Sequence, residues 1–106
     1  MCKQKNFAVS QMQYEVILLA EKYDAKILCF NYYKKIFGNI TIQIEKGNSI
    51  FTFILDRGDI ICNCMSLNDG MTRTIQSIAH SLYQENPPVQ LLKCIGEILE
   101  RYKNEF

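Results

Sequence analysis

Two tight-turn signals lie close together in the middle of this 106-residue chain, and they constrain its fold more than any other feature. Gly47-Asn48 and Arg57-Gly58 each separate two runs in which apolar residues alternate with other residues. Two-residue turns of this kind join neighbouring antiparallel strands. The stretch 38–65 therefore predicts a meander of three strands.

These turns also determine which residues face one another, because the side chains of a strand point alternately to its two faces. In this register Lys46 pairs with Ser49, and Asp56 pairs with Asp59. One face then carries only uncharged, mostly apolar side chains, namely Ile40, Ile42, Ile44, Phe51, Phe53, Leu55, Ile60, Cys62 and Cys64. The other face mixes polar and apolar side chains, namely Thr41, Gln43, Glu45, Thr52 and Asn63 with Ile50, Ile54 and Ile61. The uncharged face predicts the side of the sheet that helices cover.

A helix is predicted before the meander. Ser10 and Gln13 have the spacing of a capping box, which indicates a helix that begins at Ser10. It is expected to end near Asp24 and to follow a loose arm formed by residues 1–9. Its apolar residues recur at helical spacing, namely Met12, Val16, Leu19, Ala20 and Tyr23.

A first strand is predicted between this helix and the meander. Residues 26–33 are rich in the β-branched and aromatic side chains that favour strands. Alternation places Leu28, Phe30 and Tyr32 on one side, with Ile27, Cys29, Asn31 and Tyr33 on the other. Phe37, in the connection that follows, is expected to pack inward.

Two further helices are predicted after the meander. Residues 66–70 form a turn cluster, and a helix is expected to begin at Asp69 or Thr72 and to run to about Gln84. Its apolar stripe comprises Ile75, Ile78, Ala79 and Leu82.

The last helix is expected to have Asn86 as its cap, Pro87 as its first residue and an end near Lys103. The predicted fold class is therefore α+β, in a single globular domain that spans 1–106. It comprises an N-terminal helix, a four-stranded antiparallel meander sheet and two C-terminal helices packed on the apolar sheet face.

Composition narrows the function classes. The formal net charge is +1, and a general nucleic-acid binder usually presents a strongly basic face, so no direct nucleic-acid partner is expected.

The longest uninterrupted apolar run, Val16 to Ala20, is far too short to span a membrane or to form the core of a signal peptide. The cysteines are odd in number and scattered, as in proteins whose thiols stay reduced, namely Cys2, Cys29, Cys62, Cys64 and Cys94. We therefore expect a cytoplasmic protein with no membrane partner.

No segment carries a catalytic, cofactor or metal motif of diagnostic spacing. Cys62 and Cys64 lie on one strand face, but a metal site would need two further ligands, and His80 lies in a different predicted element. We therefore expect core thiols, with no catalytic residue, no cofactor and no metal. A small enzyme that uses a Cys–His pair stays open as an alternative, because such residues meet in space rather than in sequence.

The tripeptide Arg57-Gly58-Asp59 is expected to be a turn whose charges keep the loop tip solvated, rather than an adhesion motif. A charged tip on a rigid hairpin is also well placed to meet a partner. The predicted partner-binding residues are Asp56, Arg57, Asp59, Asp69, Tyr32 and Tyr33.

The segment FGNITIQIEKGNSIFTFILDRGDIICN, followed by helices, resembles the hairpin core of small cytoplasmic immunity proteins that bacteria encode beside polymorphic toxins. These include the immunity proteins of contact-dependent growth inhibition systems. The resemblance implies a non-catalytic protein that binds one cognate toxin domain, often a nuclease, and inhibits it.

A second class of function is compatible with the same sequence. The chain would then be an accessory or chaperone-like subunit, or a homodimeric structural protein, that pairs through a sheet edge or through its last helix. A homo-oligomer is compatible with either class.

Overall fold

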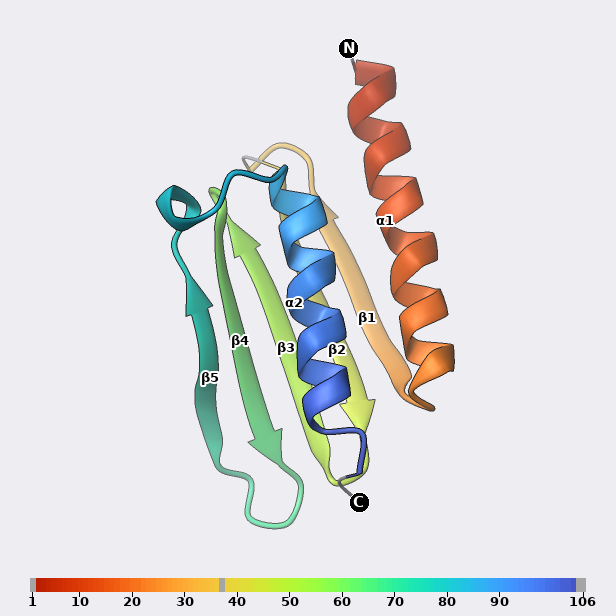
Figure 1. Ribbon diagram of the computed structural model, residues 1–106, viewed down its shortest axis with the longest axis vertical. Helices are drawn as coiled ribbons and strands as arrows, with labels where there is room; N and C mark the ends of the chain where they lie inside the picture. Colours follow the sequence, from red (N-terminus) through yellow and green to blue (C-terminus); the bar gives the residue numbers. More distant parts are fainter. Residues whose placement is uncertain (1, 37, 105–106) are drawn as a thin grey trace.

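The computed structural model describes the backbone of residues 2–36 and 38–104 and the side chains of 9–36 and 38–104. Phe37, which was expected to pack inward, lies outside these ranges. The elements in chain order are α1 (Cys2–Lys22), β1 (Lys26–Tyr33), β2 (Asn39–Lys46), β3 (Ser49–Asp56), β4 (Asp59–Ser66), β5 (Thr72–Ile78), the short 3-10 helix η1 (His80–Leu82) and α2 (Pro87–Arg101). The strands form one antiparallel sheet in sequence order, and α1 and α2 lie on the same face of it (Figure 1). The α+β class and the antiparallel sheet are confirmed.

The register predicted for the central strands is confirmed. Lys46 pairs with Ser49 across β2 and β3, and Asp56 pairs with Asp59 across β3 and β4. The first turn has a positive φ only at Gly47, at 60°, which matches the type II′ turn that Gly at this position favours. The register therefore follows from local turn chemistry and alternation alone.

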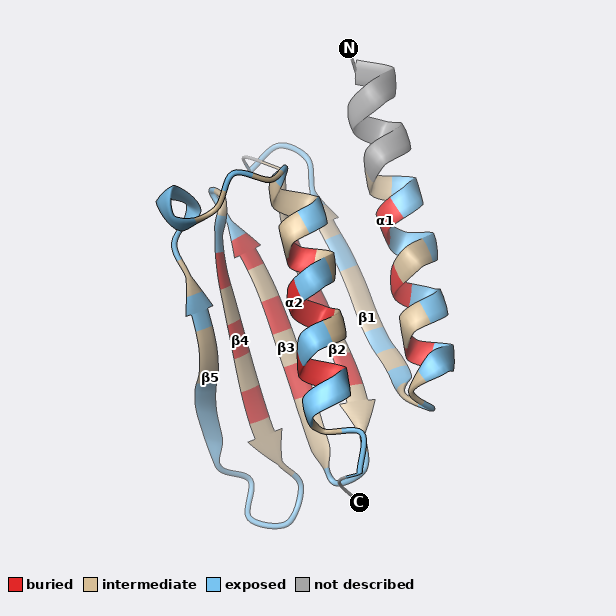
Figure 2. Ribbon diagram, viewed as in Figure 1, coloured by how far each residue is buried: buried red, intermediate tan, exposed pale blue. Residues whose placement is uncertain are grey.

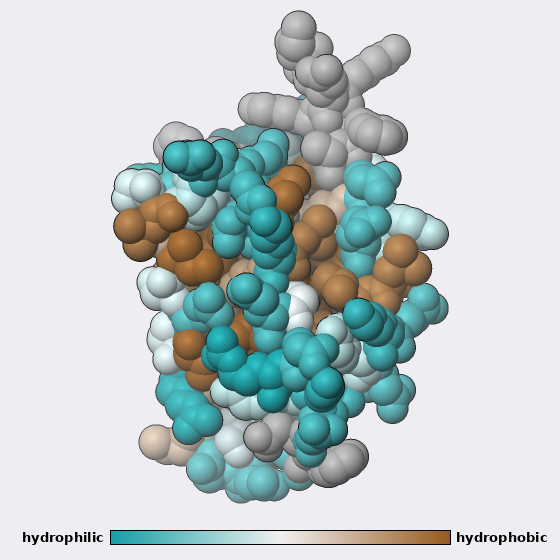
Figure 3. All heavy atoms as spheres, in the orientation of Figure 1, coloured by the Kyte–Doolittle hydropathy of each residue, from teal (hydrophilic) through white to brown (hydrophobic). Residues whose placement is uncertain are grey.

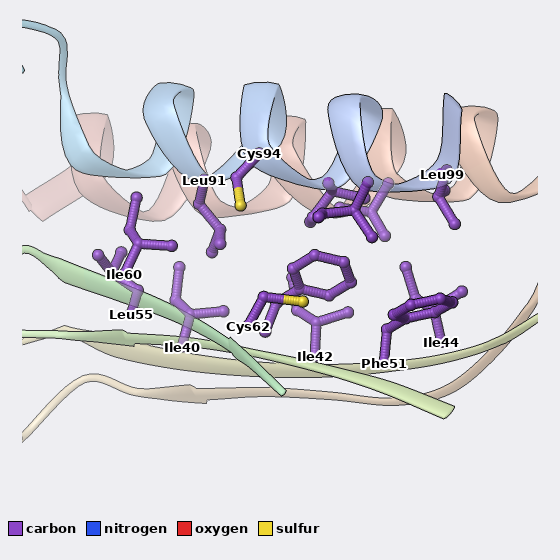
Figure 4. Close-up of a cluster of buried hydrophobic side chains, with 14 of the residues drawn as sticks. Ile40, Ile42, Ile44, Phe51, Leu55, Ile60, Cys62, Leu91, Cys94 and Leu99 are labelled. Carbon is purple, nitrogen blue, oxygen red and sulfur yellow. The ribbon is translucent and has the colours of Figure 1, made fainter. Parts of the chain in front are cut away.

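The uncharged sheet face forms the core. All of its predicted members are buried, and α2 covers them with Leu91, Cys94, Ile95, Ile98 and Leu99 (Figures 2 and 4). Cys62 on β4 and Cys94 on α2 are both completely buried. From α1, Met12, Val16 and Ala20 complete the interior. The predicted core role of the thiols at positions 62 and 64 is confirmed.

Helix α1 begins earlier than predicted. It is helical from Cys2, so Ser10 lies inside the helix rather than at its cap, and residues 2–9 do not form a loose arm. The predicted end is close to the observed one, because Asp24 takes a left-handed φ of 54° just after the helix. The Ala25 amide donates to the Ala20 carbonyl at 2.8 Å, as in a Schellman termination. Within the described ranges, no helix is long and apolar enough to cross a membrane.

The helix predicted between Asp69 or Thr72 and Gln84 is wrong. Residues 72–78 form β5, which pairs with β4, so the sheet has five strands rather than four, and α2 is the single long helix after it. The pairing of β5 shifts by one residue at Ile75, and both Ile75 and Ile78 pack against the core. The bulge thus gives the strand an apolar spacing of three residues, which resembles a helical stripe.

The same irregularity occurs on the opposite edge strand. The pairing of β1 with β2 shifts at Leu28, so Ile27 packs against the core together with Phe30 and Tyr32. Leu28 itself is 39% exposed. The strand bounds predicted from sequence are confirmed, but the prediction that Leu28 and Phe30 share one side is wrong because of the bulge.

Replacement of a central core ring tests this architecture. Phe53→Ala is expected to lower the free energy of unfolding by about 3–5 kcal/mol, because Phe53 is completely buried under α2 and its removal leaves a cavity. The matched variant Thr52→Val, one residue away on the other sheet face, should cost less than about 1 kcal/mol. Urea denaturation measures both. Similar losses for the two variants would contradict the assignment of sheet faces.

Candidate functional site

The β3–β4 turn carries backbone strain that the other two-residue turn lacks. Both of its central residues have positive φ, 55° at Arg57 and 91° at Gly58, as in a type I′ turn. Gly adopts this conformation without steric cost, but for Arg the left-handed region costs roughly 1–2 kcal/mol. Residues held in such conformations cluster at functional sites. The strain at Arg57 therefore makes this turn the leading candidate site.

One side of the turn is held by Asn39 at the start of β2. Its Nδ2 donates to Asp56 Oδ1 at 2.9 Å, and its Oδ1 accepts from the Arg57 backbone amide at 3.0 Å. Both ends of the amide group are thus satisfied by the turn. This bidentate contact fixes the backbone at the residue whose φ is strained.

The other side is held by the segment after β5. The His80 backbone amide donates to Asp59 Oδ1 at 2.9 Å, and the Tyr83 hydroxyl donates to the Gly58 carbonyl. The imidazole of His80 lies so close to Gly58 that a Cβ there would be 2.5 Å from His80 Nδ1. Burial, with a contribution from the nearby Asp59 charge, raises the pKa of Tyr83, so its hydroxyl stays protonated as a donor.

The clamped turn still exposes its charged side chains. Arg57 and Asp56 have side chains that are 70% and 58% exposed, and Arg57 Nε lies 3.9 Å from Asp56 Oδ1. Beside them, Tyr33 and Ile36 are 42% and 54% exposed. We call the group of Tyr33, Ile36, Asn39, Asp56, Arg57 and Asp59 the hairpin-tip surface.

A shallow hollow of about 250 Å³ adjoins this surface. Its lining combines apolar and polar side chains, namely Tyr33, Ile36, Asn39, Thr41, Ile54, Leu55 and Asp56. A partner side chain placed there would contact an aromatic ring and an aliphatic side chain, with a carboxylate at the rim. This combination resembles the apolar centre and polar rim of protein–protein interfaces.

The structure brings together four of the six predicted partner-binding residues. Tyr33, Asp56, Arg57 and Asp59 lie at the end of the sheet that carries the β1–β2 and β3–β4 connections (Figure 1). Tyr32 instead packs against the core, and Asp69 lies in the β4–β5 loop at the opposite end. Sequence reasoning missed Ile36, Asn39 and His80, since none of them belongs to a recognisable motif.

A larger cavity of about 500 Å³ lies at the Asp69 end. Polar side chains dominate its lining, which comprises Asn48, Ser49, Cys64, Ser66, Asn68, Asp69, Met71, Thr72, Arg73 and Tyr102. Asp69 Oδ1 accepts a hydrogen bond from the Met71 backbone amide at 2.9 Å, within the β4–β5 loop. Asp69 thus belongs to a different surface from the hairpin tip.

Among the side chains that the structure describes, no hydrogen bond joins a thiol to His80. Burial raises the pKa of Cys94 to about 11, with a further contribution from Glu97, and burial also raises the pKa of Cys62. Cys29 is partly exposed, and its Sγ contacts Gln43 Oε1 at 3.6 Å. His80, in contrast, contacts the β3–β4 turn. Among the described residues, no group of His, Cys, Asp and Glu is arranged to hold a metal ion.

Comparisons of the chain with protein-family models, curated proteins and solved structures gave no match.

A double-mutant cycle tests the close approach of His80 to the turn. Gly58→Ala should lower the free energy of unfolding by about 2 kcal/mol or more, since the new Cβ meets the imidazole and φ is positive. In a His80→Ala background the same change should cost about 1 kcal/mol less. Thermal or urea unfolding of the four proteins provides the comparison. Additive losses would show that His80 does not press on Gly58.

The buried thiols predict a pH dependence of stability. Because the pKa of Cys94 rises from 9.0 to about 11 on folding, its contribution is fully present below pH 9 and is lost as the pH rises through about 11. Unfolding measured by urea from pH 8 to 11 should therefore show a shallower decline in Cys94→Ala than in the unaltered protein. Equal slopes would contradict the burial of an uncharged thiol.

Proposed function

We propose that this chain is a cytoplasmic, non-catalytic immunity protein that binds and inhibits one cognate bacterial toxin domain, such as a nuclease, through its hairpin-tip surface. The single observation that carries the proposal is the clamped β3–β4 turn, in which Asn39 and His80 hold a strained Arg57. The resemblance of segment 37–63 to immunity-protein hairpins supplies the toxin as the partner.

A rigid tip favours tight binding because little conformational freedom is lost when the complex forms. The tip also offers the residue types that dominate interface energetics. Tyr and Arg are enriched among binding hot spots, and Tyr33 and Arg57 are both exposed at the same end of the sheet. Asp56 and Asp59 add negative charge, which would steer a basic surface such as that of a nuclease.

The thiol environments weigh against the alternative of a Cys–His enzyme. The nucleophile in such enzymes is a thiolate, which a neighbouring histidine or other positive charge stabilises. Cys62 and Cys94 have raised pKa values, and His80 packs against a turn rather than against a thiol. These observations favour binding over catalysis.

The test uses the product of the neighbouring gene, which we expect to be the toxin domain. Arg57→Glu and Tyr33→Ala should each weaken its binding by 2 kcal/mol or more, about thirtyfold in Kd, if they are hot spots, as measured by isothermal titration calorimetry. Both side chains are exposed, so the fold should be retained. Asp69→Lys is the matched control, because it alters charge at the opposite end of the sheet and should leave Kd unchanged.

Two results would overturn the assignment. Binding that is insensitive to both tip variants but lost in Asp69→Lys would move the interface to the other end of the sheet. Failure of the neighbouring gene product to bind the unaltered protein would remove the toxin as the partner.

A further inference from the structure

The sheet has a second face that no described helix covers, since α1 and α2 both lie on the core side (Figure 1). We call it the open face. The helix-covered side has a different character, because polar side chains run along α2 with apolar patches on either side of it (Figure 3). The open face is mostly uncharged, and its central residues are half-buried by their neighbours, namely Thr41, Gln43, Glu45, Ile50, Thr52, Ile54, Ile61, Asn63 and Met65.

Polar side chains cross the middle of the open face and bond to one another. Cys29 Sγ contacts Gln43 Oε1 at 3.6 Å, and Gln43 Nε2 donates to Thr52 Oγ1 at 3.3 Å. Further along the same row, Thr74 Oγ1 donates to Asn63 Oδ1 at 2.8 Å. Removing water from a polar group costs less free energy when that group already has a hydrogen-bond partner. This polar row can therefore be covered at low cost.

Apolar side chains flank the polar row on both sides. The strand register pairs Ile54 with Ile61 in one flanking row and Ile50 with Met65 in the other. Each apolar pair lies two residues along the strands from the Thr52–Asn63 pair, which lies between them on the same face. Across β3 and β4 the face is therefore nearly symmetric about the polar row.

This arrangement lets the face pack against a second copy of itself, as an isologous contact requires. A two-fold axis that runs along the polar row, parallel to the sheet, reverses the strand direction and exchanges the flanking rows. Ile54 then faces Ile50 of the second copy, and Ile61 faces Met65 of the second copy. The axis also places each residue of the polar row near its own counterpart.

We propose that a second copy of this chain packs on the open face and forms a face-to-face homodimer of two sheets. Its area is sufficient: five strands about 4.8 Å apart and eight residues of about 3.4 Å give roughly 650 Å² per copy and about 1,300 Å² in total. Specific interfaces bury about 1,200–2,000 Å².

The charges of the face are compatible with this orientation. Glu45 faces Thr41 of the second copy, and Lys26 faces Asn31 of the second copy, so no like charges meet.

The dimer does not depend on the toxin binding proposed above. A second copy covers Ile54, which also lines the hollow beside the hairpin tip, so a partner that fills the hollow competes with dimer formation.

Sedimentation equilibrium of the full chain tests the dimer. The expected mass is twice the 12.4 kDa of the monomer, and Ile61→Lys should reduce it to the monomer mass by burying two unpaired charges at the interface. The control Ile17→Lys changes a 42% exposed residue of α1 and should leave the dimer intact. If Ile61→Lys fails to fold, Thr52→Lys introduces the charge on the two-fold axis at a half-exposed polar position and should also give monomer.

Cross-linking tests the orientation. In a Cys2→Ser background, a short bis-maleimide should join Cys29 to Cys29 of the second copy, because Cys29 lies on the polar row. Peptide mapping by mass spectrometry identifies the linked residues. A monomer mass for the unaltered protein up to about 1 mM, a dimer that persists in Ile61→Lys and Thr52→Lys, or a dimer without the Cys29 link would each overturn the proposal.

Discussion

The alternation of side chains across three strands, held in register by two tight turns, is the constraint on which the whole structure depends. It places Phe51, Phe53 and their neighbours on one face, so the hydrophobic energy of the chain is gained only when α1 and α2 cover that face. A slip of one residue would turn these side chains toward solvent and place Thr52 and Asn63 in the core. The register thus decides which side of the sheet is interior and which remains open for contact with other molecules.

The two turns differ in how well their residues suit the backbone conformation that each turn requires. Gly47 accepts its left-handed conformation at no steric cost, whereas Arg57 occupies one that Asn or Gly would adopt more readily. The contacts from Asn39, Asp59, His80 and Tyr83 supply the stabilisation that keeps the Arg57 backbone in place. A turn optimised for stability alone would not carry Arg at this position, and we attribute its presence to the binding role proposed for the tip.

Much of the fold could be predicted from sequence wherever the strands are regular. The central strands keep a strict period of two, and Pro87 marks the start of α2. Prediction failed at the edge strands, where bulges at Leu28 and Ile75 change the apolar spacing from two residues to three. In β5 that spacing matches a helix. Only a tertiary interaction, the pairing of β5 with the free edge of β4, distinguishes a bulged strand from a helix in this segment.

The candidate site was predictable only in part. The charges of the β3–β4 turn are local in sequence, and four predicted residues meet there. The groups that hold the turn come from distant positions, Asn39 before it and His80 after it, and neither has a motif. Asp69 lies in the turn cluster 66–70, close in sequence to the β3–β4 turn, but the direction of β4 carries it to the far end of the sheet. Proximity of turns in sequence does not give proximity in an antiparallel meander.

Arg57→Asn tests directly whether the strain at Arg57 is retained for binding. Arg57→Asn keeps the type I′ turn and replaces a strained residue with one that tolerates positive φ. We expect the free energy of unfolding, measured in urea, to rise by about 1 kcal/mol while the affinity for the toxin domain proposed as the partner falls at least tenfold. Lower stability with unchanged affinity would contradict this expectation.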